Sequence, residues 1–272
     1  LFIAHRWQKR QSEIVSLILQ HKELWKQLFR LFERKFHPHT GSLNLFREEA
    51  FLFSSTLKSV PEQNTRSLFQ EALLFLSHTL KTNLYVPHIS ALCWRLDPSY
   101  LATWTESKDK PFAIFFLHGP NFVGYHVRFR DLSRGGLRTL CPESWEEKEQ
   151  MEHSLFSETY SLARTQQKKN KDIPEGGSKG VLLLFPPNPE ERRSPSSWIH
   201  PAQQAFIQAL VQTVNFAPDG QLLSPDIVDY WGRPEYLFLG PDEHLDEMMI
   251  EWIANFSIHS QYALKDAFIS SK

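Results

Sequence analysis

Lysines, acids and glycines gather in one stretch of the chain, Gln166–Gly180, whose sequence is QQKKNKDIPEGGSKG. A second glycine pair, Gly135-Gly136, lies between Arg134 and Arg138. Glycine lets a ligand approach the main chain closely and adopts backbone angles that other residues avoid. A glycine pair is also typical of a tight turn, and we expect both pairs to lie in turns. Because cations flank both pairs, the pattern favours a binding site for an anion over two unrelated turns.

Two kinds of anion site do not fit this pattern. A phosphate-binding loop requires Gly-x4-Gly-Lys-Ser/Thr, whereas the lysine of EGGSKG precedes Gly180, and no Gly-x-Gly-x-x-Gly dinucleotide fingerprint occurs anywhere. A nucleic-acid site would need aromatic residues and a basic excess. Gln166–Gly180 contains no aromatic residue, and 30 basic against 31 acidic residues give the chain a net charge of −1. We therefore expect no nucleic-acid partner.

Carboxylate recognition suits these residues better. Arginine and lysine beside exposed backbone amides can hold a dicarboxylate, with one cation for each carboxylate and a bidentate fork from the arginine. A lysine that is crowded by other cations and partly removed from water has a lowered pKa, which makes it useful in acid–base chemistry near neutral pH. Lys179 is the candidate for this role. The alternative is a solvated lysine in a loop.

Asp242 is the second candidate for chemistry. It follows Gly240-Pro241 at the end of an expected strand and precedes an expected helix. As the N-cap of that helix it would be structural. As a side chain in the same cleft as Lys179 it could move protons. The residues alone leave both alternatives open.

The spacing of apolar residues predicts an α/β fold with a mixed sheet, preceded by a helical segment. We expect a helical segment over residues 1–84 and an α/β domain over residues 85–272. Helices are predicted over residues 8–35, 43–57, 63–81, 146–166, 201–214 and 242–256. Strands are predicted over residues 89–96, 112–119, 122–130, 180–185 and 235–240, and alternation predicts one buried face for the strand over 122–130.

Three clusters of polar residues each border a predicted strand. They are SRGGLR (Ser133–Arg138), KKNKDIPEGGSKG (Lys168–Gly180) and LGPDEH (Leu239–His244). In open α/β sheets, ligands bind at loops that follow the strand ends. We therefore expect these clusters to form loops that converge on one cleft.

The composition argues against several other classes of protein for this chain. The two cysteines, Cys93 and Cys141, lack metal-ligand spacing, so we expect no metal site and a reducing, cytoplasmic compartment. No uncharged apolar run approaches the ~20 residues that cross a bilayer, so we expect no membrane span. The chain begins at Leu1 and stops abruptly after FISSK. We expect it to be a piece of a longer protein.

Three segments together resemble a known family. FFLHGPNFVGYHVRFRDLSRGGLR, ARTQQKKNKDIPEGGSKGVLLL and EYLFLGPDEH, in this order, resemble the large-subunit class of NAD-specific glutamate dehydrogenases from about Lys81 onwards. The resemblance implies oxidative deamination of L-glutamate to 2-oxoglutarate and ammonia, with NAD as hydride acceptor. It also implies a substrate domain of the amino-acid dehydrogenase type in a homo-oligomeric protein. The NAD-binding Rossmann domain would lie outside this chain.

The resemblance also implies roles for particular residues. Lys179 is similar in position to the catalytic lysine, and Asp242 to the acid/base aspartate. Lys169 takes the place of the lysine that holds the substrate's α-carboxylate, with Lys171 as its competitor. Arg134 takes the place of the cation near the side-chain carboxylate, where the small hexameric relatives have lysine in a Lys-Gly-Gly sequence.

The remaining predicted substrate-binding residues are the glycines Gly135, Gly136 and Gly177. An alternative for the whole chain is a non-catalytic ligand-sensing or assembly module that keeps the same fold. The intact lysine, aspartate and glycine pairs favour the enzyme.

Overall fold

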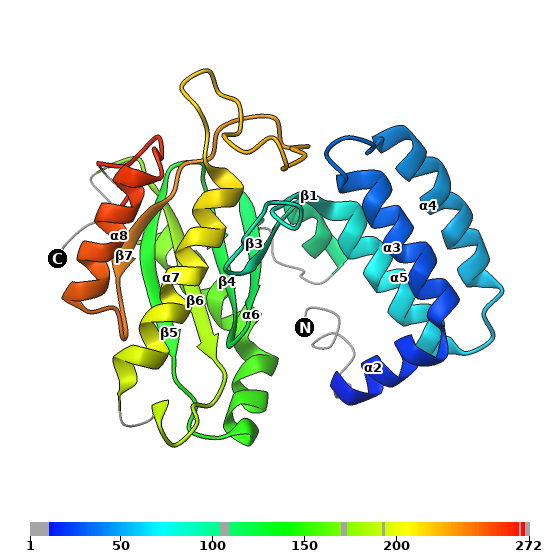
Figure 1. Cartoon of the computed structure of the whole chain (residues 1–272), viewed down its shortest axis with the longest axis horizontal. Helices are drawn as coiled ribbons and strands as arrows, with labels where there is room; N and C mark the ends of the chain where they lie inside the picture. The colour runs from blue at the N-terminus through cyan, green and yellow to red at the C-terminus, as the bar shows by residue number, and fades with distance from the viewer. Residues whose placement is uncertain (1–10, 104–108, 170–172, 192–193, 267, 270–272) are drawn as a thin grey trace. The chain divides into compact units, whose positions relative to one another are not determined.

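The computed structural model describes residues 11–103, 109–169, 173–191, 194–266 and 268–269 of the 272-residue chain. The chain divides into two compact units, Leu1–Thr79 and Leu80–Lys272 (Figure 1). The first unit is helical, and the second carries a sheet with helices on both faces.

The first unit contains four described helices, which are α2 (Gln11–Gln20), α3 (Lys22–Phe36), α4 (Leu43–Lys58) and α5 (Gln63–His78). The single helix predicted over residues 8–35 is divided at His21 into α2 and α3, and its first residues lie outside the described part. The buried faces of α3, α4 and α5 meet in one apolar core, to which the large side chains Leu31, Phe36, Phe53, Leu57 and Phe69 contribute.

The second unit is built on a seven-stranded sheet with the order β1-β2-β3-β4-β6-β5-β7. Its strands are β1 (Thr79–Thr82), β2 (Leu92–Leu96), β3 (Ala113–Gly119), β4 (Phe122–Arg128), β5 (Ser133–Leu140), β6 (Gly176–Leu184) and β7 (Phe238–Pro241). The neighbours from β2 to β6 run antiparallel, whereas β5 runs parallel to both β6 and β7. The sheet is mixed, so the predicted fold class is confirmed.

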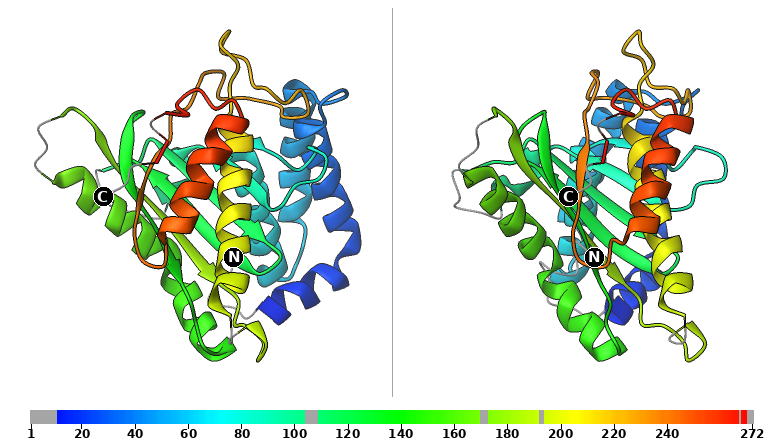
Figure 2. Two further views of the ribbon diagram at one scale, coloured as in Figure 1. Left: turned by 60° about the vertical axis from the view of Figure 1, so that its left-hand side comes forward. Right: turned by 90° about the vertical axis from the view of Figure 1, so that its left-hand side faces the viewer.

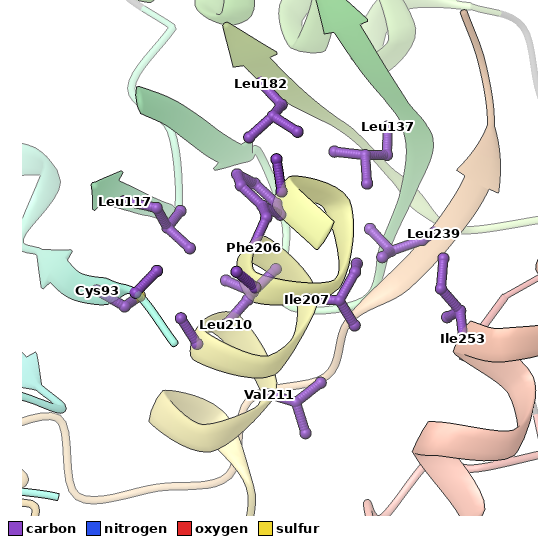
Figure 3. Close-up of a cluster of buried hydrophobic side chains, with 14 of the residues drawn as sticks. Cys93, Leu117, Leu137, Leu182, Phe206, Ile207, Leu210, Val211, Leu239 and Ile253 are labelled. Carbon is purple, nitrogen blue, oxygen red and sulfur yellow. The ribbon is translucent and has the colours of Figure 1, made fainter. Parts of the chain in front are cut away.

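Helices cover both faces of this sheet (Figure 2). Helix α6 (Trp145–Lys168) packs on one face against β4 and β6. Helix α7 (Pro195–Val214) packs on the opposite face, with α8 (Glu247–His259) beside it. The main apolar core lies between α7 and the sheet, where strand residues such as Leu137 and Leu182 meet Phe206 and Leu210 (Figure 3). A 3₁₀ helix (Pro98–Thr103) follows β2.

Four predictions about the elements were wrong, for reasons of packing. Strand β4 is buried on both faces because α6 and α7 cover the sheet on both sides. Strand β5 occupies a segment predicted as a glycine turn, and β1 occupies the end of a predicted helix. Helix α7 begins six residues before Pro201, which it contains, since Trp198 and Ile199 are buried in the core.

A buried cluster of charges joins the segment just before β7 to the strands β1, β2 and β4. The Glu235 carboxylate lies 2.8 Å from Lys81 Nζ, 3.2 Å from Arg95 Nε and 2.7 Å from Arg128 Nη2, and all four side chains are fully buried. Burial raises the pKa of the Glu235 carboxyl, but the three cations outweigh it and lower this pKa to about 2. Arg128 also donates to the carbonyl oxygens of Asp131 and Tyr236, at 2.7 and 2.6 Å. The cluster therefore fixes the segments that lead into β5 and β7.

Replacing Glu235 by glutamine should strongly destabilise the fold. The substitution removes the one carboxylate that these buried cations share, and breaking a buried ion pair costs about 3–5 kcal/mol. We expect a loss of that size in the free energy of unfolding, measured by chemical denaturation. The control is Glu149→Gln on the exposed side of α6, which should change stability by no more than ~0.5 kcal/mol. Equal effects of the two substitutions would contradict this account of the cluster.

Candidate active site

A cavity of about 550 Å³ lies between the C-terminal half of α6 and the strands β5, β6 and β7. Its walls carry cations, an acid, two hydroxyl groups and backbone without side chains at the glycines. The lining residues are Arg134, Gly135, Gly136, Leu162, Thr165, Gln166, Lys169, Ser178, Lys179, Gly240, Pro241 and Asp242. Six of the seven predicted site residues are among them, and Gly177 is not.

Lys179 and Asp242 meet in this cavity although 63 positions separate them in the sequence. Lys179 lies inside β6, and its ammonium donates to Oδ2 of Asp242, just beyond the end of β7. The parallel register places Leu137 of β5 opposite both Gly180 and Pro241. Because β5 lies between the two strands, the lysine and the aspartate reach the same point from either side of it.

The pKa of Lys179 lies well below that of an ordinary lysine. Burial of its ammonium lowers the pKa of Lys179 to about 8, and the positive charges of Arg138 and Lys169 act in the same direction. A carboxylate in contact favours the charged form, so Asp242 opposes this shift. A pKa near the working pH suits a group that gives or takes a proton.

Two glycines of β5 make room for this arrangement. A Cβ at Gly135 would lie 1.7 Å from the carbonyl oxygen of Ser178, so β5 and β6 approach too closely there for any side chain. A Cβ at Gly136 would lie 2.8 Å from Cβ and 2.9 Å from Oδ2 of Asp242. Gly136 therefore leaves the space that the aspartate carboxylate occupies.

The prediction that the glycine pairs form turns was wrong. Gly135-Gly136 lies within β5 and Gly176-Gly177 lies at the start of β6. Neither pair has the positive φ that is typical of a glycine in a turn. Among the glycines that the structure describes, Gly220 and Gly232 have a positive φ. These positions require glycine because another main chain or side chain comes close, and this is a tertiary constraint.

Gly177 does not line the cavity, but a close neighbour requires glycine there as well. A Cβ there would lie 2.0 Å from the backbone nitrogen of Gln167, and the Gly177 N–H donates to Oε1 of Gln167 at 2.7 Å. The glycine therefore allows β6 to run directly against the last turn of α6. This contact positions Gln166 and Lys169, which do line the cavity.

The three polar clusters converge on one cavity, as predicted, but they line it on the face of the sheet and not as loops at strand ends. Arg134, Gly136 and Arg138 lie on alternate positions within β5, and Lys179 is the fourth residue of β6. Of the three clusters, LGPDEH alone begins in a strand and continues past its end. The prediction of loops was wrong because the glycine pairs were taken for turns between strands, whereas they lie within β5 and at the start of β6.

Asp242 is not the N-cap of the following helix. Helix α8 begins at Glu247, and its N-cap is Asp246, whose side chain accepts a hydrogen bond from the Met249 N–H at 2.9 Å. The Oδ1 atom of Asp242 accepts from the Glu243 N–H at 2.9 Å, which leaves Oδ2 for Lys179. The alternative prediction, that Asp242 caps the following helix, was therefore wrong.

The two predicted carboxylate ligands lie at the rim. Arg134 is 44% exposed and forms an ion pair with Glu175 at 2.9 Å. Lys169 is the C-cap residue of α6 and is exposed. Its predicted competitor, Lys171, lies outside the described residues.

Sequence reasoning missed the helical wall of the cavity. Leu162, Thr165, Gln166 and Lys169 follow the spacing i, i+3, i+4, i+7, which places them on one helical face. This spacing, taken together with the candidate Lys169, could have identified the other three residues.

No cluster of potential metal ligands occurs among the residues that the structure describes. In that same part of the chain, no helix is long and apolar enough to cross a membrane.

Replacing Gly135 by alanine should disrupt the contact of β5 with β6. The added methyl group would overlap a backbone carbonyl that cannot move without breaking the sheet, and overpacking of this kind costs about 1–3 kcal/mol. Gly240→Ala is the matched control on β7, because the nearest atom to its Cβ would lie at 3.8 Å. Chemical denaturation should show a clear loss of stability for Gly135→Ala and little change for Gly240→Ala. If Gly135→Ala were as stable as the control, the close approach would be wrong.

Comparison with known proteins assigns most of the chain to one family. Residues 53–272 match the family described as "Bacterial NAD-glutamate dehydrogenase, catalytic domain". The chain is 37% identical over 243 residues to glutamate dehydrogenase 2 of Dictyostelium discoideum, covering 88% of this chain and 22% of that protein. It is 31% identical over 260 residues to the NAD-specific glutamate dehydrogenase of Saccharomyces cerevisiae, covering 90% of this chain and 23% of that protein.

A third relative is the NAD-specific glutamate dehydrogenase of Neurospora crassa, 32% identical over 250 residues, which cover 88% of this chain and 23% of that protein. The chain thus spans less than a quarter of the length of these three relatives. The chain belongs to the family of bacterial NAD-glutamate dehydrogenase catalytic domains.

Proposed function

We propose that this chain is the substrate-binding part of an NAD-dependent glutamate dehydrogenase, which converts L-glutamate to 2-oxoglutarate and ammonia. One observation carries the proposal: Lys179 and Asp242 are in contact inside a cavity whose rim carries Arg134 and Lys169. The names of the three relatives support glutamate as the substrate. Because the chain is a small part of those proteins, activity is to be tested in a full-length protein.

The cavity offers separate positions for the two carboxylates of glutamate. Arg134 at the start of β5 faces the side-chain carboxylate, and Lys169 at the end of α6 faces the α-carboxylate. An arginine fork can bind a carboxylate through two parallel hydrogen bonds. The bare backbone at Gly135 and Gly136 lets the substrate lie close to β5.

The amino group then lies near Lys179 and Asp242. In this proposal the Asp242 carboxylate takes a proton from the substrate's ammonium, so that the lone pair on nitrogen is available when the Cα–H bond breaks. Lys179, as the free amine, takes a proton from the water that adds to the iminium carbon, and the ammonium formed stabilises the oxygen of the adduct. The protonated Asp242 carboxyl returns its proton to the leaving nitrogen. Ammonia departs as the carbonyl forms, and the proton of the hydroxyl group passes back to the Asp242 carboxylate.

NAD is the cofactor that the names of the relatives support, and when bound it accepts the hydride from Cα. The chain contains no Gly-x-Gly-x-x-Gly sequence, which is the fingerprint of a dinucleotide-binding turn. We therefore assign no contact with NAD to residues of this chain. The cytoplasmic location expected from the cysteines and the homo-oligomeric state implied by the resemblance stay predictions.

Replacing Lys179 by alanine should reduce kcat for glutamate by about 10³-fold, because the substitution removes the group that assists proton transfer and charge stabilisation. The fold should remain, since the lysine lies at a cavity and alanine adds no volume. The measurement is glutamate-dependent NAD reduction by the full-length protein, with circular dichroism to check folding.

The control is Lys168→Ala. Lys168 is 58% exposed, pairs with Asp109 and does not line the cavity, so this variant should keep its activity. A Lys179→Ala protein that turned over glutamate at the rate of the control would remove Lys179 from the mechanism. A wild-type protein with no glutamate-dependent activity would instead favour the non-catalytic alternative.

A further inference from the structure

We propose that Glu175, which has no role in the account above, is the residue that positions Arg134 for the side-chain carboxylate of the substrate. It would thereby set the preference for an acidic side chain. This inference rests on the proposed function and adds a specificity-determining residue to it.

Arg134 is held between two neighbouring strands. In the parallel ladder it lies opposite Gly177 of β6 on one side and Phe238 of β7 on the other. Its guanidinium carbon lies 5.6 Å from the centre of the Phe238 ring. On the β6 side, Gly177 has no side chain that could support the guanidinium, and the Glu175 carboxylate approaches it instead.

The acid is anchored more firmly than the arginine. The side chain of Glu175 is 7% exposed, whereas that of Arg134 is 44% exposed. The backbone around Glu175 is fixed by hydrogen bonds from the Glu175 N–H to the carbonyl of Ile173 at 2.9 Å and from the Gly176 N–H to that of Leu132 at 2.8 Å. A buried carboxylate on a fixed backbone therefore sets the position of a more exposed guanidinium.

The pairing leaves donors available for a ligand. Glu175 contacts Nη2 of the guanidinium, and an arginine carries five N–H donors. Arg134 lines the cavity and Glu175 does not. The substrate carboxylate can therefore bind the exposed side of the guanidinium while Glu175 holds its buried side. Without Glu175, the long side chain would have many conformations to lose on binding.

The test uses the selectivity of the full-length protein between glutamate and norvaline, whose side chain ends in a methyl group in place of the carboxylate. Glu175→Ala should raise KM for glutamate about tenfold with little change in kcat, because it removes an aid to binding. Activity toward norvaline should change little, so the ratio of kcat/KM for glutamate over norvaline should fall about tenfold. In an Arg134→Ala background, the additional substitution of Glu175 should have no further effect on this ratio.

Glu49→Ala is the matched control. Glu49 forms a similar ion pair, with Arg34 at 3.0 Å, in the helical unit, and its loss should leave the ratio unchanged. Equal losses for both amino acids in Glu175→Ala would show a merely structural role and overturn the inference. A higher preference for glutamate would also overturn it, because Glu175 would then be a competitor for Arg134.

The controls separate this inference from the proposed function. If Arg134→Ala lowered the ratio but Glu175→Ala did not, the inference about Glu175 alone would fail. If neither substitution changed the ratio, the role of Arg134 in the proposed function would fail as well.

Discussion

The contact between the Lys179 ammonium and the Asp242 carboxylate is the interaction on which the candidate site depends. It requires the strand order β6-β5-β7, because β5 must separate the strands that carry the two residues. It also requires that β7 end at Pro241, level with Leu137 of β5, so that Asp242 can turn over the sheet. The space into which it turns is empty because residue 136 is glycine. The contact on which the catalytic proposal rests therefore depends on the backbone geometry of β5 and β7.

Burial separates the structural charges of this unit from those of the cavity. The cations around Glu235 are fully buried and share one acid, so they connect strands and are closed to any ligand. At the cavity, Lys179 and Arg134 are each held by one acid while part of the side chain still faces the open space. A cation that is held on one side and open on the other loses little freedom when a carboxylate binds. The two groups are linked, because Arg128 and Glu235 fix the approach to β7 and hence the place of Asp242.

The type of chemistry could be predicted from the sequence better than the geometry that performs it. Lys179 and Asp242 were recognised from their neighbours and from the resemblance, and the structure brings them together. The glycine pairs were taken for turns because Gly-Gly is most often a turn, and nothing in one sequence shows that Ser178 will lie against Gly135. Strand β1 was missed because it is four residues long and follows a helix without a break. Glu175 was passed over since its burial and its contact with Arg134 arise only when β5 and β6 pair.

The central claim is that Lys179 and Asp242 act as one unit on one substrate. A double-mutant cycle measures this most directly, with kcat determined for Lys179→Ala, Asp242→Ala and the double variant of the full-length protein. If the two groups act together, the double variant should be slower than the worse single variant by no more than about tenfold, because the second substitution removes an already broken unit. Losses that multiply in the double variant would mean that the lysine and the aspartate act independently, and would contradict the account.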